Sequence, residues 1–421
     1  MKIKEKYYES VGEQVYFTRL SNGLTIHLIP KEDYYETYGI ITTKFGSVDT
    51  RILVNGDERQ YPAGIAHFLE HKVFVQKDDP QPMEFFAKSG SICNAYTTFR
   101  NTTYLFYATE NLEENINYLL DYVQNIYLTP ESVESEKGII AEEIHMYEDR
   151  PNEVLIEKTR LNSLNNNPYR DSIIGTVKDI ESITKEDLET CYHTFYHPSN
   201  MFIVVSGNFN VEKIMETIRE NQRNKEFKEL DKIKIKEFEE KDKVYKEKEI
   251  IKSSTPKAAY TIKIPLKNIK LTRRKLHLYL YILFTTLFDE TSDFDQKLKE
   301  ENIITSTTYV SLLNCNTHIL ISLINETPKY EEFLSKLKEK LETLEVKEAD
   351  FNRKKKVLIS NEMLAFESVE TVNDIIIDNI IYDNKLEDNP IEIIKSLTYK
   401  ELKELIKELD IKNTNTVIVK K

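Results

Sequence analysis

Two segments of the chain follow the same plan of a helix followed by a strand. They are SITKEDLETCYHTFYHPSNMFIVVSG, which begins at Ser182, and SLTYKELKELIKELDIKNTNTVIVKK, which begins at Ser396. In each, a threonine precedes an acidic residue by three positions, a spacing that satisfies free backbone N–H groups where a helix starts. The repeat indicates a duplicated domain, although chance similarity of two common helix-plus-strand units is the competing explanation.

The length of 421 residues also favours two domains, since one domain typically takes about 100 to 200 residues. Strands interrupted by long helices predict an α+β fold of two tandem homologous domains, each a mainly antiparallel mixed sheet with helices packed on it. The expected boundaries are 1–225 for the first domain, 226–245 for a charged linker and 246–421 for the second domain. Alternation in NAYTTFRNTTYLFYA, at 94–108, predicts an extended strand.

Composition restricts the partners and the compartment. A formal charge of −13 argues against a nucleic-acid surface, which needs clustered Lys and Arg. The three cysteines, Cys93, Cys191 and Cys315, suggest neither a disulfide framework nor a thiolate metal site, so a cytoplasmic location is expected. The most apolar run, 278–288, is too short to span a bilayer and predicts a buried helix without membrane insertion.

The stretch AGIAHFLEHKVF, at 63–74, places two histidines and a glutamate in an apolar run. On a helix His67, Glu70 and His71 share one face, because successive residues turn by about 100°. Two imidazoles on adjacent turns can bind one metal ion, and the carboxylate can accept a proton from water beside it. A pair of idle histidines is the alternative, but burying three ionisable side chains without partners costs several kcal/mol.

Four motifs in order carry a resemblance to a known family. GIAHFLEHKVF, SGSICNAYTTFRNTTYLFYA, ESEKGIIAEEIHMYEDRP and YHPSNMFIVVSGNF resemble the pitrilysin/insulinase family of zinc metallopeptidases, the inverzincins with the H-x-x-E-H order. The likeness is strongest to the bacterial branch similar to mitochondrial processing peptidase. It covers residues 1–210, and the second half resembles the family only in outline.

The resemblance implies a catalytic site with one Zn²⁺ per chain. It makes His67 and His71 zinc ligands and Glu70 the general base. The third ligand is a glutamate in EKGIIAEEI, where Glu142 and Glu143 stand side by side. The family pattern favours Glu143 and leaves Glu142 as a solvated helix charge.

Further roles follow from the same resemblance. Glu136, seven residues before Glu143, is the family's carboxylate that orients a ligating imidazole. The strand with Asn94, Ala95 and Tyr96 is expected to pair with an extended peptide substrate. Phe74 and Tyr96 resemble members of an apolar pocket beside the scissile bond, with core packing as the alternative for either aromatic residue.

The second half departs from the family pattern. Complete members carry an arginine and a tyrosine there, spaced like L-R-x-K-x-x-x-x-Y, which donate hydrogen bonds to the substrate and the developing oxyanion. The matching region is QKLKEENIITSTTY, with Lys299 at the arginine position, Thr305 or Ser306 near the tyrosine position, and Tyr309 displaced. The resemblance therefore implies a heterodimer in which a paralogous subunit without the metal motif supplies the pair. A homodimer is the alternative.

The sequence thus predicts a zinc metalloendopeptidase that hydrolyses extended or unfolded peptides, with processing of a precursor or leader peptide as one option. The alternative from another class is a non-catalytic peptide-binding or scaffolding subunit, whose members usually lose H-x-x-E-H. A cysteine-protease interpretation of Cys191 and His193 is set aside, because residues two apart on a helix point in different directions.

Overall fold

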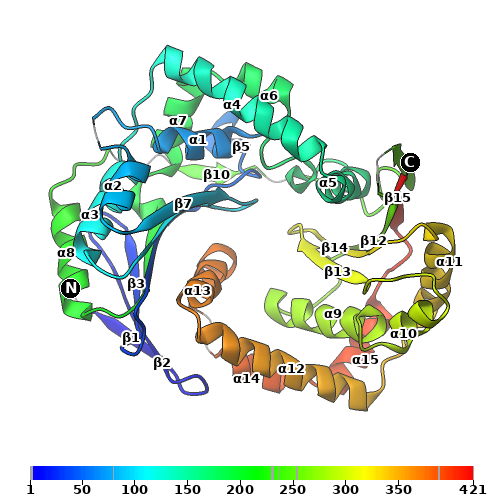
Figure 1. Ribbon diagram of the computed structural model, residues 1–421. Coiled ribbons are helices and arrows are strands. Elements are labelled where there is room, and N and C mark those ends of the chain that lie inside the picture. The colour runs from blue at the N-terminus through cyan, green and yellow to red at the C-terminus, as the bar shows by residue number, and fades with distance from the viewer. Residues whose placement is uncertain are drawn as a thin grey trace. The chain divides into compact units, whose positions relative to one another are not determined.

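The computed structural model describes residues 3–78, 80–228, 232–236, 238–252, 255–386 and 389–420 (Figure 1). The chain forms two compact units, and neither is continuous in sequence. Unit 1 comprises Met1–Ile144, Asp171–Lys236 and Met363–Asn389, and unit 2 comprises His145–Arg170, Glu237–Glu362 and Pro390–Lys421.

Unit 1 contains ten of the described strands: β1 (Lys4–Tyr8), β2 (Glu13–Arg19), β3 (Thr25–Pro30), β4 (Thr37–Thr43), β5 (Arg51–Val54), β6 (Asp57–Gln60), β7 (Ile92–Thr97), β8 (Thr102–Ala108), β9 (Met201–Gly207) and β10 (Ile233–Ile235). Its helices are α1 (Ile65–Val73), α2 (Pro82–Lys88), α3 (Leu112–Val123), most of α4 (Pro130–Glu148), α6 (Val177–Ser182), α7 (Lys185–Phe195), α8 (Val211–Arg223) and α13 (Val369–Asp383).

Unit 2 is built from strands β11 (Lys248–Lys252), β12 (Lys257–Pro265), β13 (Tyr309–Asn314), β14 (His318–Glu326) and β15 (Thr414–Lys420). Its helices are α5 (Pro151–Ser163), α9 (Arg273–Phe288), α10 (Asp293–Glu300), α11 (Tyr330–Leu341), most of α12 (Glu348–Phe366), α14 (Pro390–Ser396) and α15 (Tyr399–Glu408).

The main sheets of the two units share one topology. The seven-stranded sheet has the order β1-β2-β3-β9-β4-β8-β7, and the five-stranded sheet has the order β11-β15-β12-β14-β13. In each, one parallel pair (β3 with β9, β11 with β15) is followed by antiparallel neighbours. The repeated order confirms the expected α+β fold of two homologous, mainly antiparallel sheets with helices.

Both faces of the unit 1 sheet are buried, because successive apolar residues point to opposite faces of a strand. Ile41 and Ile203 belong to the large core that includes α1, α3, α7 and α8. Ile40 and Val204 belong to a second core, which α13 completes with Val372 and Ile376. A helix from near the end of the chain therefore covers one face of the first sheet.

Unit 2 has the corresponding arrangement. Tyr260 and Ile262 pack with α9, α11 and α15 in its main core. On the other face, Ala259, Val417 and Val419 pack against Leu155 of α5. The sequence domains 1–225, 226–245 and 246–421 stay a prediction, since the compact units are defined by contacts and include α5 and α13 from the opposite halves of the chain.

Local signals identified several elements correctly. Thr184 Oγ1 accepts from the Asp187 backbone N–H at 3.1 Å at the start of α7, and Thr398 Oγ1 accepts from that of Glu401 at 3.2 Å at the start of α15. The apolar run 278–288 lies in α9 and is buried, as expected. No helix among the described residues is both long and apolar enough to cross a bilayer.

The expected extended segment 94–108 is a hairpin of β7 and β8 rather than one strand. Thr98 and Asn101 close its turn, where the Thr98 N–H donates to the Asn101 carbonyl at 2.8 Å and the Thr98 hydroxyl donates to Asn101 Oδ1 at 2.7 Å. The period-two pattern continues on both sides of this turn, so alternation alone cannot reveal the reversal.

The expected linker is ordered where the structure describes it. Ile233–Ile235 forms β10 and pairs with β5 in unit 1. In unit 2 the carboxylate of Glu240 forms an ion pair with Lys263 at 2.6 Å, with both side chains fully buried. It also accepts backbone N–H groups from Asn165, Asn166 and Asn167. These contacts anchor the segment to the core of unit 2.

Candidate metal centre

Helix α1 supplies three of the side chains in the candidate site. It begins after Gly64, whose φ of 84° lies in the left-handed region. A Cβ at this position would lie 2.5 Å from the Ile174 carbonyl oxygen, so the close approach of that loop requires glycine. This turn sets the start of α1, on which His67, Glu70 and His71 follow within two helical turns.

Helix α4 brings Glu143 to the two histidines. His67 Nε2 lies 3.7 Å and His71 Nε2 lies 3.5 Å from the same oxygen of Glu143, Oε2. One ligand atom from each of these residues lies within 4.8 Å of the other two. Among the described residues, His67, His71 and Glu143 therefore form a group that could hold a metal ion. The neighbouring Glu142 is exposed.

A hydrogen-bond chain fixes the orientation of His71. Its Nδ1 lies 3.0 Å from Glu136 Oε1, and Lys72 Nζ donates to Glu136 Oε2 at 3.2 Å and to the Ser132 carbonyl at 3.0 Å. Lys72 is only 1% exposed. Because Nδ1–H is donated to Glu136, Nε2 is the ring nitrogen that faces Glu143 and can act as a metal ligand once its proton is lost.

Burial and hydrogen bonds set the pKa values of His67, His71 and Glu143. Burial lowers the pKa of His67 to about 4, so its ring is neutral at pH 7 and can act as a ligand. Burial alone would also lower the pKa of His71, but hydrogen bonds to Glu136 and Glu143 outweigh it and raise that pKa to about 9. The hydrogen bond from His71 lowers the pKa of Glu143, which stays ionised.

Glu70 is buried beside this group and has its own hydrogen-bond donor. The Thr97 hydroxyl, on β7, donates to Glu70 Oε2 at 2.6 Å. Burial raises the pKa of Glu70, and the Thr97 hydrogen bond and the nearby His71 oppose that rise. A carboxylate with a raised pKa accepts and returns a proton more readily near neutral pH than an exposed one.

The residues expected to contact a peptide lie on or near β7. Asn94 is exposed, and Ala95 and Tyr96 are half-buried. Strand β7 is the last in its sheet order, so one of its edges has no neighbouring strand among the described residues. Phe74 is the C-terminal cap residue of α1. The centroid of its ring lies 5.9 Å from that of Tyr104 and 5.8 Å from that of Tyr122, so it packs in the aromatic core of unit 1.

The second-half residues at the expected arginine and tyrosine positions have other partners or are exposed. Lys299 forms an ion pair with Asp295 at 2.7 Å and donates to Thr307 Oγ1 at 3.0 Å. Thr305 and Ser306 are exposed in a loop, and Tyr309 is 62% exposed on β13. The Cys191 thiol is fully buried, and burial raises its pKa well above the usual range.

Two residues of the site were missed from the sequence. Lys72 follows His71 directly, and its position inside an apolar helix is a signal that a buried acid must lie nearby. Thr97 shares a strand face with Ala95 and lies on β7, the strand expected to pair with a peptide. Neither contact could be derived from spacing, because each partner lies far along the chain, at Glu136 and Glu70.

The residues present fit a zinc ion. Two imidazole nitrogens and one carboxylate form a donor set typical of catalytic zinc, which keeps one position open, and His71 would release its Nε2 proton when the ion binds. The carboxylate Glu136 that holds the second ring nitrogen of His71 is the outer-shell partner found for ligating histidines.

Comparisons with known proteins identify the family of the chain. A model described as insulinase (peptidase family M16) matches residues 56–177, and one described as peptidase M16 inactive domain matches 182–358. The zinc protease YmfH of Bacillus subtilis is 39% identical over 310 residues, which is 72% of each chain. The mitochondrial-processing peptidase subunit beta of Dictyostelium discoideum is 25% identical over 228 residues, 53% of this chain and 47% of that protein.

A solved structure gives the same answer over the whole chain. The crystal structure of an M16-like peptidase from Alicyclobacillus acidocaldarius superposes with a TM-score of 0.91 and 29% identity, covering 97% of this chain and 99% of that one. The family models, the relatives named zinc proteases and this structural match lead to one assignment. The chain belongs to the insulinase family of peptidases, family M16.

Proposed function

We propose that the protein is a zinc-dependent endopeptidase that hydrolyses extended or unfolded peptides. The observation that carries the proposal is the convergence of His67, His71 and Glu143, with Glu70 buried beside them. The relatives named zinc proteases support the same metal and reaction.

His67, His71 and Glu143 would hold the zinc ion. When bound, zinc acts as a Lewis acid toward water and the peptide carbonyl. Glu70 accepts the proton of the attacking water and returns it to the leaving amine, so that the peptide C–N bond breaks and the proton balance closes. Thr97 keeps the Glu70 carboxylate in one orientation.

Strand β7 would position the substrate. An extended peptide can add to the open edge of β7 and pair with the backbone near Asn94, Ala95 and Tyr96. Backbone pairing requires an unfolded segment of the substrate and depends little on its side chains. Such a substrate could be a free peptide or the leader of a precursor. The packing of Phe74 in the core assigns it a supporting role behind the site.

We also propose that the active assembly is a heterodimer with a paralogous chain that lacks the metal motif, with a homodimer as the alternative. Lys299 is held by Asp295 and Thr307, and lysine cannot form the planar bidentate contacts of arginine. One relative is named as a subunit, the beta subunit of mitochondrial-processing peptidase. Three buried thiols suit a reducing compartment, so the proposed location is the cytoplasm.

A non-catalytic peptide-binding role is the second candidate, because one family model that matches the chain is described as an inactive domain. That match covers residues 182–358, whereas the metal-binding group lies at 67–143 and retains the three ligands together with Glu70. The enzyme is therefore the function that the site supports best.

The test replaces Glu70 by glutamine and measures both metal content and cleavage of a flexible quenched peptide. Glu70→Gln should retain about one zinc per chain while turnover falls by at least about 100-fold, because the proton acceptor is lost. Glu142→Gln, at an exposed neighbour of the third ligand, is the matched control and should keep both properties. Unchanged turnover in Glu70→Gln would reject Glu70 as the base.

A further inference from the structure

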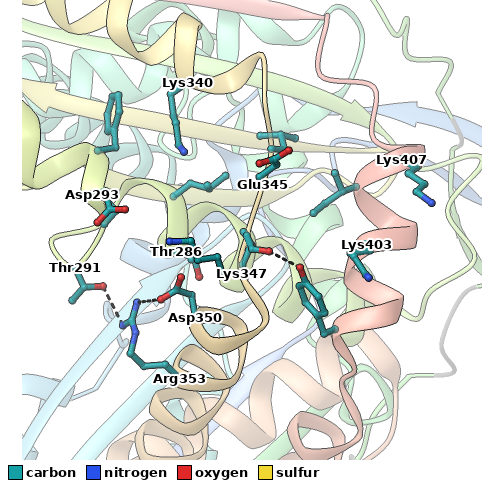
Figure 2. A pocket seen from close by; sticks show the side chains of 17 residues that line it. Thr286, Thr291, Asp293, Lys340, Glu345, Lys347, Asp350, Arg353, Lys403 and Lys407 are labelled. Atoms are coloured by element: carbon teal, nitrogen blue, oxygen red, sulfur yellow. Dashed lines mark hydrogen bonds and ion pairs between the residues drawn. The ribbon is translucent and has the colours of Figure 1, made fainter.

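Unit 2 contains a cavity of about 650 Å³ that lies within this unit and shares no residue with the metal centre. The end of α9, the start of α10, the connection from α11 to α12, the start of α12 and one side of α15 form its walls (Figure 2). Small-molecule sites typically measure about 300 to 1,000 Å³, so the size suits a ligand of low molecular weight.

One part of the cavity wall is apolar. Leu287 and Val346 are buried, and Leu344 and Ile406 are partly buried and face the same space. The Tyr399 ring also lines it, while the hydroxyl of this residue is used in a hydrogen bond to the Val346 carbonyl at 2.7 Å. An apolar group can therefore lose water against this wall without leaving a polar atom unpaired.

Positive side chains gather at the same cavity, on a chain whose formal net charge is −13. Five cationic residues line it: Lys340, Lys347, Arg353, Lys403 and Lys407. Figure 2 shows Lys340 at the top of the view, Lys347 near its centre, and Lys403 and Lys407 on helix α15.

Two of these five cations already have partners within the protein. Arg353 pairs with Asp350 at 3.4 Å and donates to Thr291 Oγ1, and Lys403 lies over the Tyr399 ring. For Lys340, Lys347 and Lys407 no carboxylate lies within ion-pair distance among the residues that the structure describes.

Thr286 also lines the cavity and is 9% exposed. Its Oγ1 has no hydrogen-bond partner among the described residues, but this atom is itself buried, so the hydroxyl does not face the open space.

We propose that this cavity binds a small amphipathic anion with one negatively charged head and an apolar body. The apolar body lies against Leu344, Val346 and Ile406, and the head is paired by Lys347 and Lys407. The inference concerns a site separate from the metal centre and does not depend on the proposed peptidase activity.

The acidic side chains of the cavity limit the charge of the ligand. Asp293, Glu345 and Asp350 lie in the same wall as the lysines. A polyanion such as a nucleotide polyphosphate would place several charges near these carboxylates, where like charges repel. A single carboxylate head can contact the unpaired lysines and avoid the acids, so a medium-chain or aryl carboxylate is the favoured chemistry.

Calorimetric titration with three ten-carbon probes tests the proposal: decanoate, neutral decanol and cationic decyltrimethylammonium. Decanoate should bind saturably at one site per chain, at least about tenfold more tightly than decanol, because pairing with the lysines adds to the apolar contact.

A matched pair of charge variants locates the binding. Lys347→Gln with Lys407→Gln should weaken decanoate binding at least about tenfold. Lys336→Gln with Lys400→Gln removes the same charge from a half-buried position on α11 and an exposed position on α15, both outside the cavity, and should leave affinity unchanged. The proposal is overturned by equal affinity for decanoate and decanol, by equal effects of the two variant pairs, or by no saturable binding up to about 1 mM.

Discussion

The ion pair between Lys72 and Glu136 supports the orientation of His71. Glu136 uses one oxygen for His71 Nδ1 and the other for Lys72 Nζ, and both residues of the ion pair are more than nine-tenths buried. Although burial alone would raise the pKa of Glu136, the hydrogen bond from His71 and the charge of Lys72 lower it. The carboxylate therefore stays ionised and strengthens His71 as a ligand.

Glu136→Gln should have two separable effects. Zinc affinity should fall about 10- to 100-fold, because the ring of His71 loses its carboxylate partner. The zinc-free protein should lose about 3 kcal/mol of unfolding free energy, because Lys72 would keep a buried charge without a counter-ion. Competition with a chromogenic chelator measures the first effect, and urea unfolding measures the second.

A second substitution distinguishes these effects. Adding Lys72→Met to Glu136→Gln removes the stranded charge, so stability should recover in part while zinc affinity stays low. Glu134→Gln, at an exposed position on the same helix, should change neither quantity. Recovery of zinc affinity in the double variant would contradict the orienting role of Glu136.

Helix α13 places acidic residues beside the tyrosines of the unit 1 sheet. Glu370, Asp374 and Asp378 recur every four residues. All three charges act on Tyr96 of β7, and those of Glu370 and Asp374 also act on Tyr38 of β4. Burial, followed by repulsion from Glu370 and Asp378, raises the pKa of Asp374 from 3.8 to about 6. Ionisation of Asp374 is therefore less favourable in the folded protein than in the unfolded chain.

The consequence is that the contribution of Asp374 to stability decreases as pH rises. At this carboxyl group the folded state binds more protons than the unfolded state between about pH 4 and pH 6, so its contribution to the free energy of unfolding falls across this window. Asp374→Asn should therefore stabilise the protein above pH 6, by about 1 kcal/mol since the side chain is partly solvated, and should have little effect near pH 4. Urea unfolding between pH 4 and pH 8 measures this dependence.

Asp57→Asn, at an exposed position on β6, is the control and should show no comparable pH dependence. A loss of stability at pH 8 on Asp374→Asn would contradict the raised pKa, because it would mean that the ionised carboxylate stabilises α13.

Element types were predictable from local patterns, whereas the partners of elements were not. The spacing of Thr184 and Asp187 predicted the start of α7, and the apolar run 278–288 predicted α9. Nothing local indicates that α5 packs on β15 or that α13 packs on β4 and β9. The strands offer apolar residues to both faces of each sheet, and any amphipathic helix could cover either face.

The seven-stranded and five-stranded sheets share an order of five strands, but the chemistry differs between the two units. The group able to hold a metal ion, within the described part of the chain, lies in unit 1. The spacing of His67, Glu70 and His71 was sufficient to predict that the three side chains share one face of a helix, because helix geometry alone places them there. The prediction of Glu143 as the third residue of this group depended on the family resemblance. Its separation from α1 in the sequence says nothing about whether the two are in contact.

The repeated topology is also relevant to assembly. The second half of this chain has the same fold as the first without the metal motif, and the proposed partner chain lacks that motif as well. Loss of oxyanion donors typically costs about 100-fold or more in turnover. The isolated chain should therefore cleave a quenched peptide slowly, and addition of a paralogue that has the arginine and tyrosine but no H-x-x-E-H should raise kcat/KM about 100-fold. Light scattering coupled to gel filtration should detect a one-to-one complex at the same stoichiometry as maximal activity.

Two controls assign the gain to the proposed heterodimer. A paralogue whose arginine and tyrosine are replaced by lysine and phenylalanine should still bind but should not activate, because the donors to the oxyanion are lost or misplaced. Mixing the unmodified paralogue with Glu70→Gln should yield no activity, because the partner contains no metal site of its own. Full activity of the isolated chain as a monomer would show that this chain completes its own site, and full activity as a dimer of identical chains would favour the homodimer.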